Sequence, residues 1–306
     1  MGLTKPIEQN LFSYQGTFMY LKDIIRGGIK MNYLYSRNNI LARVAEAALQ
    51  LVFPLSTYCL CCGKPVDSTR SYSICDHCIH RIRWGNIVID LEAESRRLGR
   101  ASHLDSAAAC MKYGLYERRL IFDLKYDGRT YVARAIGKIM ADRLAAQGGG
   151  PVDTGGPGGP ACPDGQNGPA RHGGGFDYIV PVPVHRDRER ARGFNQAEKM
   201  ARHLSGRIGV PVLPRAVIRH KNTTAQRSLS AEDRYFNLEG AFSLNPGDAE
   251  RIKGSRILLL DDVYTTGATA HRCGAVLKEG GAARVDFIAL ATGNDFAYGY
   301  FDDKQR

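Results

Sequence analysis

Two adjacent carboxylates, Asp261 and Asp262, lie between a short apolar run and a turn rich in hydroxyl groups. Residues 256–260 hold four consecutive apolar side chains, too few for a helix, and predict a buried parallel strand that ends at the acids. A helix is predicted from Ala268 onward. A turn of small residues before a helix N-terminus exposes backbone N–H groups that point one way and bind anions.

The same stretch offers two kinds of contact to one ligand. The turn suits a phosphate, and the two carboxylates can accept hydrogen bonds from vicinal hydroxyls, so the pattern predicts a site for ribose 5-phosphate. An ordinary strand-to-helix turn of an open α/β sheet is the alternative. The phosphoacceptor pocket of response regulators also follows a strand with two acids, but that pattern opens its domain and lacks the Thr-Thr-Gly-Ala-Thr continuation. The P-loop pattern of nucleotide triphosphatases does not occur.

Four cysteines form two Cys-x-x-Cys pairs, Cys59 with Cys62 and Cys75 with Cys78. This spacing lets both sulfurs of a tight turn face one ion, and four thiolates complete a tetrahedral Zn²⁺ shell. We expect a structural zinc, because so short a segment cannot bury enough apolar area to fold without a metal. Redox-active or unligated thiols are the alternative. Nearby residues that offer alternative ligands are Cys61, His77 and His80.

The composition is that of a soluble globular protein with a basic surface. In 306 residues, 42 Lys and Arg against 31 Asp and Glu give a net charge of +11, which favours nucleic acid, polyphosphate substrates or an acidic membrane face as partners. No apolar run approaches the roughly 18 residues of a membrane span. Paired cysteines without a signal peptide indicate the reducing cytoplasm.

Further elements must bring side chains to the acids. Residues 176–184 predict a strand, and the loop after it carries four arginines before a helix at 197–207. Ligands of α/β sheets bind beyond the carboxyl ends of strands, and arginine suits bidentate phosphate contact. The alternative is a solvated basic helix face. Other predicted strands are 107–113, 210–219 and 284–291; other predicted helices are 116–124 and 130–146.

Three regions follow from these patterns. Residues 1–36 predict a flexible extension, with Met31 as an alternative start of the natural chain. Residues 37–100 predict an amphipathic helix followed by the four-cysteine module, with a basic, helix-compatible stretch after it. Residues 101–306 predict the α/β domain, interrupted at 147–175 by a Gly- and Pro-rich insertion that lacks large apolar residues and is expected to be disordered.

The order of these motifs resembles that of one protein family. Lys-Tyr-Asp-Gly at 125–128, Val-Pro-Val-Pro at 180–183 and Arg-Gly-Phe-Asn-Gln-Ala at 192–197 precede a strand, two acids and Thr-Thr-Gly-Ala-Thr. The last motif resembles the phosphoribosyl pyrophosphate (PRPP) signature of type I phosphoribosyltransferases. The whole series, from about Pro54 to Thr292, resembles the ComF family of competence-associated, phosphoribosyltransferase-like proteins. The resemblance implies a phosphoribosyltransferase-like parallel sheet flanked by helices, with a small zinc-ribbon-like module.

The resemblance also implies roles for individual residues. Asp261 and Asp262 would hold the ribose hydroxyls and serve catalysis. The PRPP loop would continue through Val263, Tyr264, Thr265, Thr266, Gly267, Ala268 and Thr269. The pyrophosphate loop would include Val184, His185, Arg186 and Arg192. A mobile lid would include Thr224, Gln226, Arg227 and Arg234.

The cofactors and partners that the resemblance implies are PRPP with Mg²⁺, a structural zinc, single-stranded DNA and a competence helicase. The expected place is the cytoplasm, at the inner face of the membrane. Three functions stay open: a ComF-type protein that binds PRPP and supports handling of incoming DNA in transformation, a genuine phosphoribosyltransferase of nucleotide salvage or amidophosphoribosyltransferase type, and a non-catalytic DNA-binding module. The sequence identifies no acceptor site.

Overall fold

The computed structural model describes residues 58–67, 70, 72–99, 101–126, 131–146, 175–221, 237–293 and 297–300. Several predicted features lie outside these residues: the N-terminal extension, the amphipathic helix before Pro54 and the Gly- and Pro-rich insertion up to residue 174. The predicted lid residues also lie outside them, namely Thr224, Gln226, Arg227 and Arg234.

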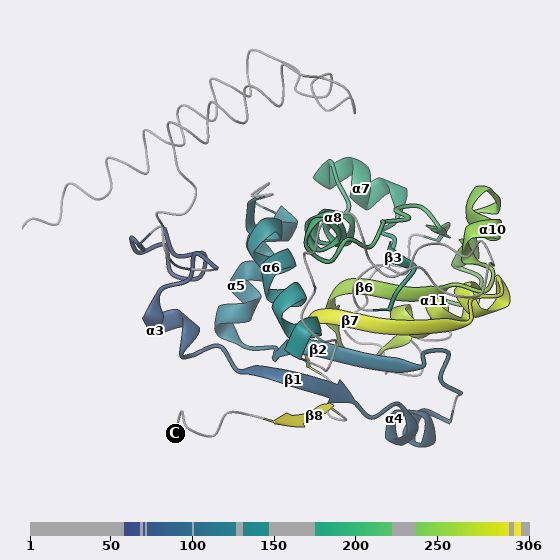
Figure 1. Cartoon of the computed structure of the whole chain (residues 1–306), viewed down its shortest axis with the longest axis horizontal. Helices are drawn as coiled ribbons and strands as arrows, with labels where there is room; N and C mark the ends of the chain where they lie inside the picture. The colour runs from purple at the N-terminus through teal and green to yellow at the C-terminus, as the bar shows by residue number, and fades with distance from the viewer. Residues whose placement is uncertain are drawn as a thin grey trace, which may run out of the picture. The chain divides into compact units, whose positions relative to one another are not determined.

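A six-stranded sheet in the order β3-β6-β7-β2-β1-β8 forms the centre of the fold (Figure 1). Its strands are β3 (Tyr178–Pro181), β6 (Arg256–Tyr264), β7 (Arg284–Thr292), β2 (Ser106–Lys112), β1 (Trp84–Ile89) and β8 (Ala297–Tyr300). The first four are mutually parallel, which confirms the predicted parallel sheet. β1 is antiparallel to both β2 and β8, so the sheet ends in a mixed edge.

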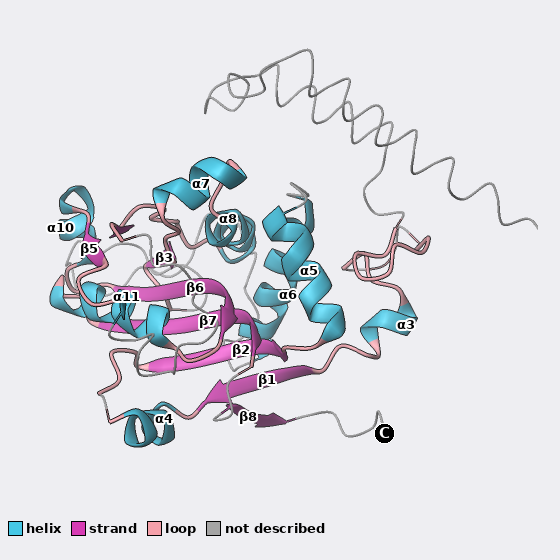
Figure 2. Ribbon diagram, turned by 180° about the vertical axis from the view of Figure 1, so that it is seen from behind, coloured by secondary structure: helices cyan, strands magenta, loops and turns pink. Residues whose placement is uncertain are grey.

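Apolar side chains cover both faces of the sheet. On β6, Leu258 and Leu260 belong to one hydrophobic core, and Ile257 and Leu259 belong to the other. Such two-sided burial explains why β6 is a continuous apolar run rather than an alternating one. The elements around the first core are α5 (Leu115–Tyr126), α6 (Tyr131–Ala146) and α8 (Gln196–Ile208), and those around the second are α11 (Ala268–Glu279), β4 (Val217–Arg219) and β5 (Phe242–Leu244) (Figure 2).

Short elements connect these layers. They are α3 (Asp76–Ile79), α4 (Leu91–Leu98), α7 (Arg186–Arg192), the 3₁₀ turn η2 (Pro246–Asp248) and α10 (Ala249–Ile252). Asp90 caps α4 by accepting a hydrogen bond from the N–H of Ala93 at 2.8 Å, and Gly99 ends the helix with φ 59°. Among the described residues, no helix is both long and apolar enough to cross a bilayer.

The four-cysteine segment shares a core with the α/β domain. Cys59, Ile74 and Cys78 are buried in the same cluster as Leu120 of α5 and Met140 of α6. The segment is therefore packed against these helices rather than held by a metal alone.

Candidate functional site

The two acids lie on β6, between the edge strand β3 and β7, at a point where β3 has ended. β3 pairs with β6 only as far as Pro181 and Leu260, whereas β7 pairs with β6 as far as Tyr264. Strand β6 thus runs through both acids to Tyr264, two residues beyond the predicted end. Asp261 is half-buried and Asp262 is buried, and the backbone N–H of Asp262 donates to Asp261 Oδ1 at 2.8 Å.

The loop after β6 turns sharply into α11. Thr265 is exposed, Thr266 is half-buried, and Gly267 is the N-cap of α11 with φ 68°, in the left-handed region that favours glycine. No side chain caps this helix, so its first N–H groups are not used by a capping oxygen. A helix N-terminus of this kind, next to two carboxylates, can hold a phosphate while the acids accept hydrogen bonds from hydroxyls.

The predicted PRPP-loop residues differ in how far they are buried. Val263 and Thr269 are half-buried, and Ala268 is buried at the start of α11. Tyr264 points into the core: it is 1% exposed, and its hydroxyl donates to Glu94 Oε2 at 2.7 Å. Only the backbone of Tyr264 is therefore available to a ligand in the loop.

The predicted pyrophosphate loop is mostly helical. Val184 lies before α7, and His185 is the N-cap of this helix. The Nδ1 atom of His185 accepts a hydrogen bond from the N–H of Asp187 at 3.2 Å. Arg186 is exposed, and Arg192 donates from Nη1 to Gln196 Oε1 at 3.1 Å. No residue of α7 is buried: Arg186 and Arg190 are exposed, and Arg188 and Arg192 are half-buried.

A buried asparagine fixes the position of this basic segment. Asn195 Oδ1 accepts from the N–H of Ala197 at 2.9 Å and so caps α8. Its Nδ2 donates to the carbonyl of Val182 at 3.0 Å. One side chain thereby ties the start of α8 to the segment that leaves β3.

Sequence reasoning missed one basic residue near the acids, Arg219 at the end of β4. Burial lowers the pKa of its guanidinium, the charge of Arg188 lowers it further, and Cys273 and Asp261 act in the opposite direction. Arg219 also lies over the ring of Phe242, 5.4 Å from its centroid. The charges of Arg219 and Asp261 thus influence each other, and a lone arginine at a strand end gave no signal for this.

The predicted metal ligands converge. The sulfurs of Cys59, Cys62, Cys75 and Cys78 all lie within 4.8 Å of one another. In the described part of the chain, neither Cys61 nor a histidine joins this group. Although burial raises the pKa of Cys59, N–H groups of Cys75, Cys62 and Cys61 bring it to about 7, whereas burial raises the pKa of both Cys75 and Cys78. Four thiolates at this spacing fit Zn²⁺.

Comparison with known proteins agrees with this geometry. A phosphoribosyl transferase domain matches residues 190–299, which contain the acids, the turn and α11. Competence protein F of Haemophilus influenzae is 40% identical over 115 residues, covering 38% of this chain and 50% of that protein. Competence protein ComFC of Bacillus subtilis is 36% identical over 115 residues, covering 37% of this chain and 43% of that protein.

The chain is a homologue of the ComF proteins. A further relative, the DNA utilization protein YhgH of Salmonella typhi, is 35% identical over 174 residues, covering 56% of this chain and 65% of that protein. The chain thus spans about half the length of the Haemophilus relative that it matches. In this ComF homologue the phosphoribosyl transferase match begins after the four cysteines, α4 and β3, so these elements lie outside it.

Proposed function

We propose that this ComF homologue binds PRPP at the carboxyl end of β6. The observation that carries the proposal is the junction of β6 and α11, where Asp261, Asp262 and the Gly267 turn meet inside a phosphoribosyl transferase domain. The first N–H groups of α11 would hold the 5-phosphate, and the two acids would accept hydrogen bonds from the ribose hydroxyls.

Basic residues would hold the pyrophosphate. The arginines of α7 follow β3, the strand next to β6, and Arg219 of β4 interacts electrostatically with Asp261. Mg²⁺ fits the same place, because it prefers carboxylate and phosphate oxygens, and when bound it would neutralise charge on the departing pyrophosphate. Arg219 and the α7 arginines would then stabilise the charge that develops on that group.

The biological role that we propose is support for the handling of incoming single-stranded DNA in natural transformation, beside a competence helicase. The names of the relatives, competence proteins and a DNA utilization protein, support this role. A sugar-transfer reaction with a nucleotide-salvage or amine acceptor is the alternative, and it requires an acceptor site.

Replacing both acids tests the proposal. The Asp261→Asn and Asp262→Asn double variant keeps the side-chain shapes but loses both negative charges, so PRPP binding in the presence of Mg²⁺ should fall below detection in a calorimetric titration. Glu92→Gln, an exposed change on α4, is the matched control and should bind as the natural chain does. An unchanged titration of the double variant would refute the assignment.

A second candidate function, binding of single-stranded nucleic acid, is favoured by one surface. Exposed apolar side chains lie on and before α5, namely Tyr113 (40% exposed), Leu115 (83%) and Phe122 (53%). Exposed arginines accompany them: Arg83, Arg118 and Arg119. Aromatic rings that stack on bases, with cations for the phosphates, are the recurring features of single-strand binding.

Salt-dependent binding of an oligonucleotide tests this second function. Phe122→Ala with Arg118→Ala should weaken anisotropy-detected binding of oligo(dT) about tenfold, since one stacked base contributes roughly 1–3 kcal/mol. The double asparagine variant of the β6 acids should bind the oligonucleotide normally. Equal affinity of the α5 variant and the natural chain would exclude this surface.

A further inference from the structure

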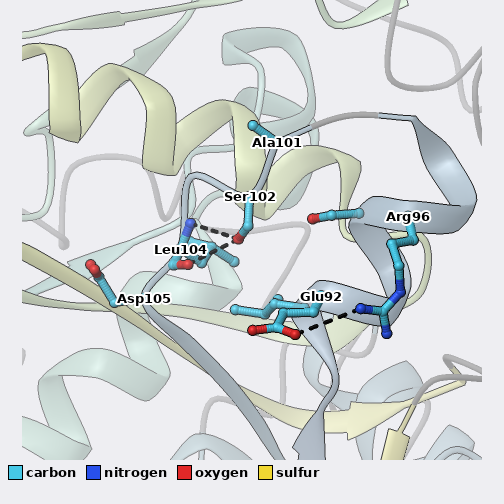
Figure 3. A pocket seen from close by; sticks show the side chains of 8 residues that line it. Glu92, Arg96, Ala101, Ser102, Leu104 and Asp105 are labelled. Carbon is cyan, nitrogen blue, oxygen red and sulfur yellow. Dashed lines mark hydrogen bonds and ion pairs between the residues drawn. The ribbon is translucent and has the colours of Figure 1, made fainter.

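The segment from α4 to the start of β2 contacts α11 at three points along its length. This segment, residues 91–105, lies outside the phosphoribosyl transferase match, whereas α11 begins at the proposed phosphate loop. Figure 3 shows a hollow of about 510 Å³ lined by residues of α4 and of the stretch 101–105. Glu94, also on α4, lies against the loop at Gly267.

The first contact is a buried polar cluster of Glu94, Tyr264 and His271. The three residues are 2%, 1% and 1% exposed. Tyr264 Oη donates to Glu94 Oε2 at 2.7 Å, His271 Nε2 lies 3.3 Å from Tyr264 Oη, and it lies 3.5 Å from Glu94 Oε2. Buried polar groups that bond to one another in this way restrict each other to a single arrangement.

A hydrogen bond from the backbone determines the tautomer of the His271 imidazole in this cluster. The N–H of His103 donates to His271 Nδ1 at 3.3 Å, so Nδ1 is an acceptor and Nε2 carries the proton. The Nε2–H group of His271 faces Glu94 and Tyr264. The carboxyl group of Glu94 is thus the acceptor toward which both other members of the cluster point.

The turn that follows β6 rests on this cluster. A Cβ on Gly267 would lie 2.7 Å from Tyr264 Cζ and 2.8 Å from Glu94 Oε1, closer than any side chain allows. The backbone of Gly267 therefore touches the tyrosine and the glutamate directly. The carbonyl of Gly267 also accepts from the N–H of His271 at 2.9 Å, which closes the first turn of α11 over the cluster.

Two more contacts hold the rest of α11 to the same segment. A Cβ on Gly274 would lie 2.7 Å from the carbonyl oxygen of His103, so only glycine permits this approach. Nearer the end of the helix, Lys278 Nζ pairs with Asp105 Oδ2 at 2.7 Å. Residues 94–105 thus touch α11 at its first, middle and last turns.

We propose that Glu94 and His271 are positioning residues that hold Tyr264, and through it the Gly267 turn, in the geometry that binds the 5-phosphate. The inference rests on the proposed function, because it concerns the same site. None of the three side chains touches the ligand. Their effect is to keep the backbone N–H groups at the start of α11 in place before the ligand arrives, which removes part of the ordering cost of binding.

Conservative variants test this role. Glu94→Gln weakens the acceptor without changing its size, and Tyr264→Phe removes only the hydroxyl while the ring keeps its contact with Phe287, 5.2 Å between centroids. Each should weaken binding of ribose 5-phosphate about tenfold, since breaking a buried hydrogen bond has an effect of that order. Binding of inorganic pyrophosphate, which would contact the arginines, should stay within about twofold of the natural chain. Glu92→Gln on the same helix is the matched control.

Hydrogen exchange of the free protein separates the inference from the proposed function. In both variants, the amides of residues 265–270 should exchange about tenfold faster, while those of β7 keep their protection. This readout requires no ligand. If the natural chain failed to bind PRPP, the proposed function would fall, and exchange would still decide whether the cluster orders the turn. Natural exchange at 265–270 in Tyr264→Phe, or faster exchange throughout the domain, would overturn the positioning role.

Discussion

Single residues in the β6–α11 junction differ in what they present to the site. Asp261 and Thr265 reach the surface, whereas Tyr264 lies in the core and contributes only its backbone. These residues are neighbours in the sequence motif. However, β6 continues through Tyr264, so the side chain of Tyr264 points into the core. The site therefore combines an exposed threonine, a half-buried Asp261 and a buried Asp262 on a core that includes Tyr264.

Gly267 is the residue whose replacement tests that support. Gly267→Ala adds strain at φ 68° and forces the new Cβ against Tyr264 and Glu94. We expect loss of PRPP binding and destabilisation of roughly 1–3 kcal/mol, measured by calorimetry and by denaturant unfolding. Gly209→Ala is the control, because Gly209 has φ 72° with nothing within 4 Å of its Cβ. Equal effects of the two changes would mean that contact with the cluster is unimportant.

Elements with a clear periodicity were predictable from the sequence. The predicted helices 130–146 and 268–278 correspond to α6 and α11, and the predicted strand 107–113 corresponds to β2. The basic stretch after the cysteines, which we expected to suit a helix, contains the helix α4, but its first part is β1, because Ile87, Val88 and Ile89 favour a strand. Of the predicted strand 210–219, Val217–Arg219 is β4 and Val212 forms a single parallel bridge with Ile179, while Pro211 and Pro214 lack the N–H that a longer ladder needs.

Contacts between distant elements were not predictable. Glu94 and Tyr264 are 170 residues apart, and nothing in the local pattern of either one indicates the other. The four cysteines are an exception, because metal ligation imposes a spacing that the sequence itself displays. Residues that only pack against each other in the fold need no fixed spacing in the sequence. The acids and the turn were therefore foreseen, whereas their support and Arg219 were not.

The contact between α11 and the segment before β2 predicts a pH dependence. Burial alone would raise the pKa of Asp105, but hydrogen bonds from Lys278 and from the N–H of Val285, with the charges of Lys278 and Arg284, lower it overall. A carboxyl group whose pKa is lower in the folded state stabilises the fold above its unfolded pKa of about 3.9 and loses that effect as the pH falls through the folded value.

We therefore expect Asp105→Asn to unfold at lower denaturant concentration than the natural chain at pH 7. The difference should shrink as the pH falls from about 5 to 3, because the natural carboxyl then takes up a proton. Glu92→Gln, which removes an exposed pair with Arg96, should show almost no difference at any pH. If the difference in unfolding denaturant concentration between Asp105→Asn and the natural chain did not change with pH, the role assigned to the Asp105–Lys278 pair would be wrong.

At the scale of the whole described fold, the cysteine segment and the α/β domain stabilise each other. Cys59, Cys78 and Ile82 lie in one core with α5 and α6, which in turn pack on the sheet. Loss of the metal is thus expected to loosen more than the cysteine loops. The same core contains Ile179 of β3 and buried residues of α8, which follows the basic segment.

Removal of zinc tests this coupling. Chelation, or Cys59→Ser, should release one zinc per chain and lower the unfolding temperature by several degrees, with faster hydrogen exchange in α5 and α6. Cys61→Ala should retain the full zinc content, since Cys61 is outside the four-sulfur group. Zinc loss from the Cys61 variant, or an unfolding temperature that does not respond to chelation, would show that the ligand set or the coupling is wrong.

The most direct measurement of the central claim is a crystal structure of the full chain grown with PRPP and Mg²⁺. We expect density for a phosphate over the first N–H groups of α11, and for ribose hydroxyls within hydrogen-bond distance of Asp261 and Asp262. Density for the ligand at any other place, or a turn after β6 that stays empty at saturating PRPP, would contradict the claim.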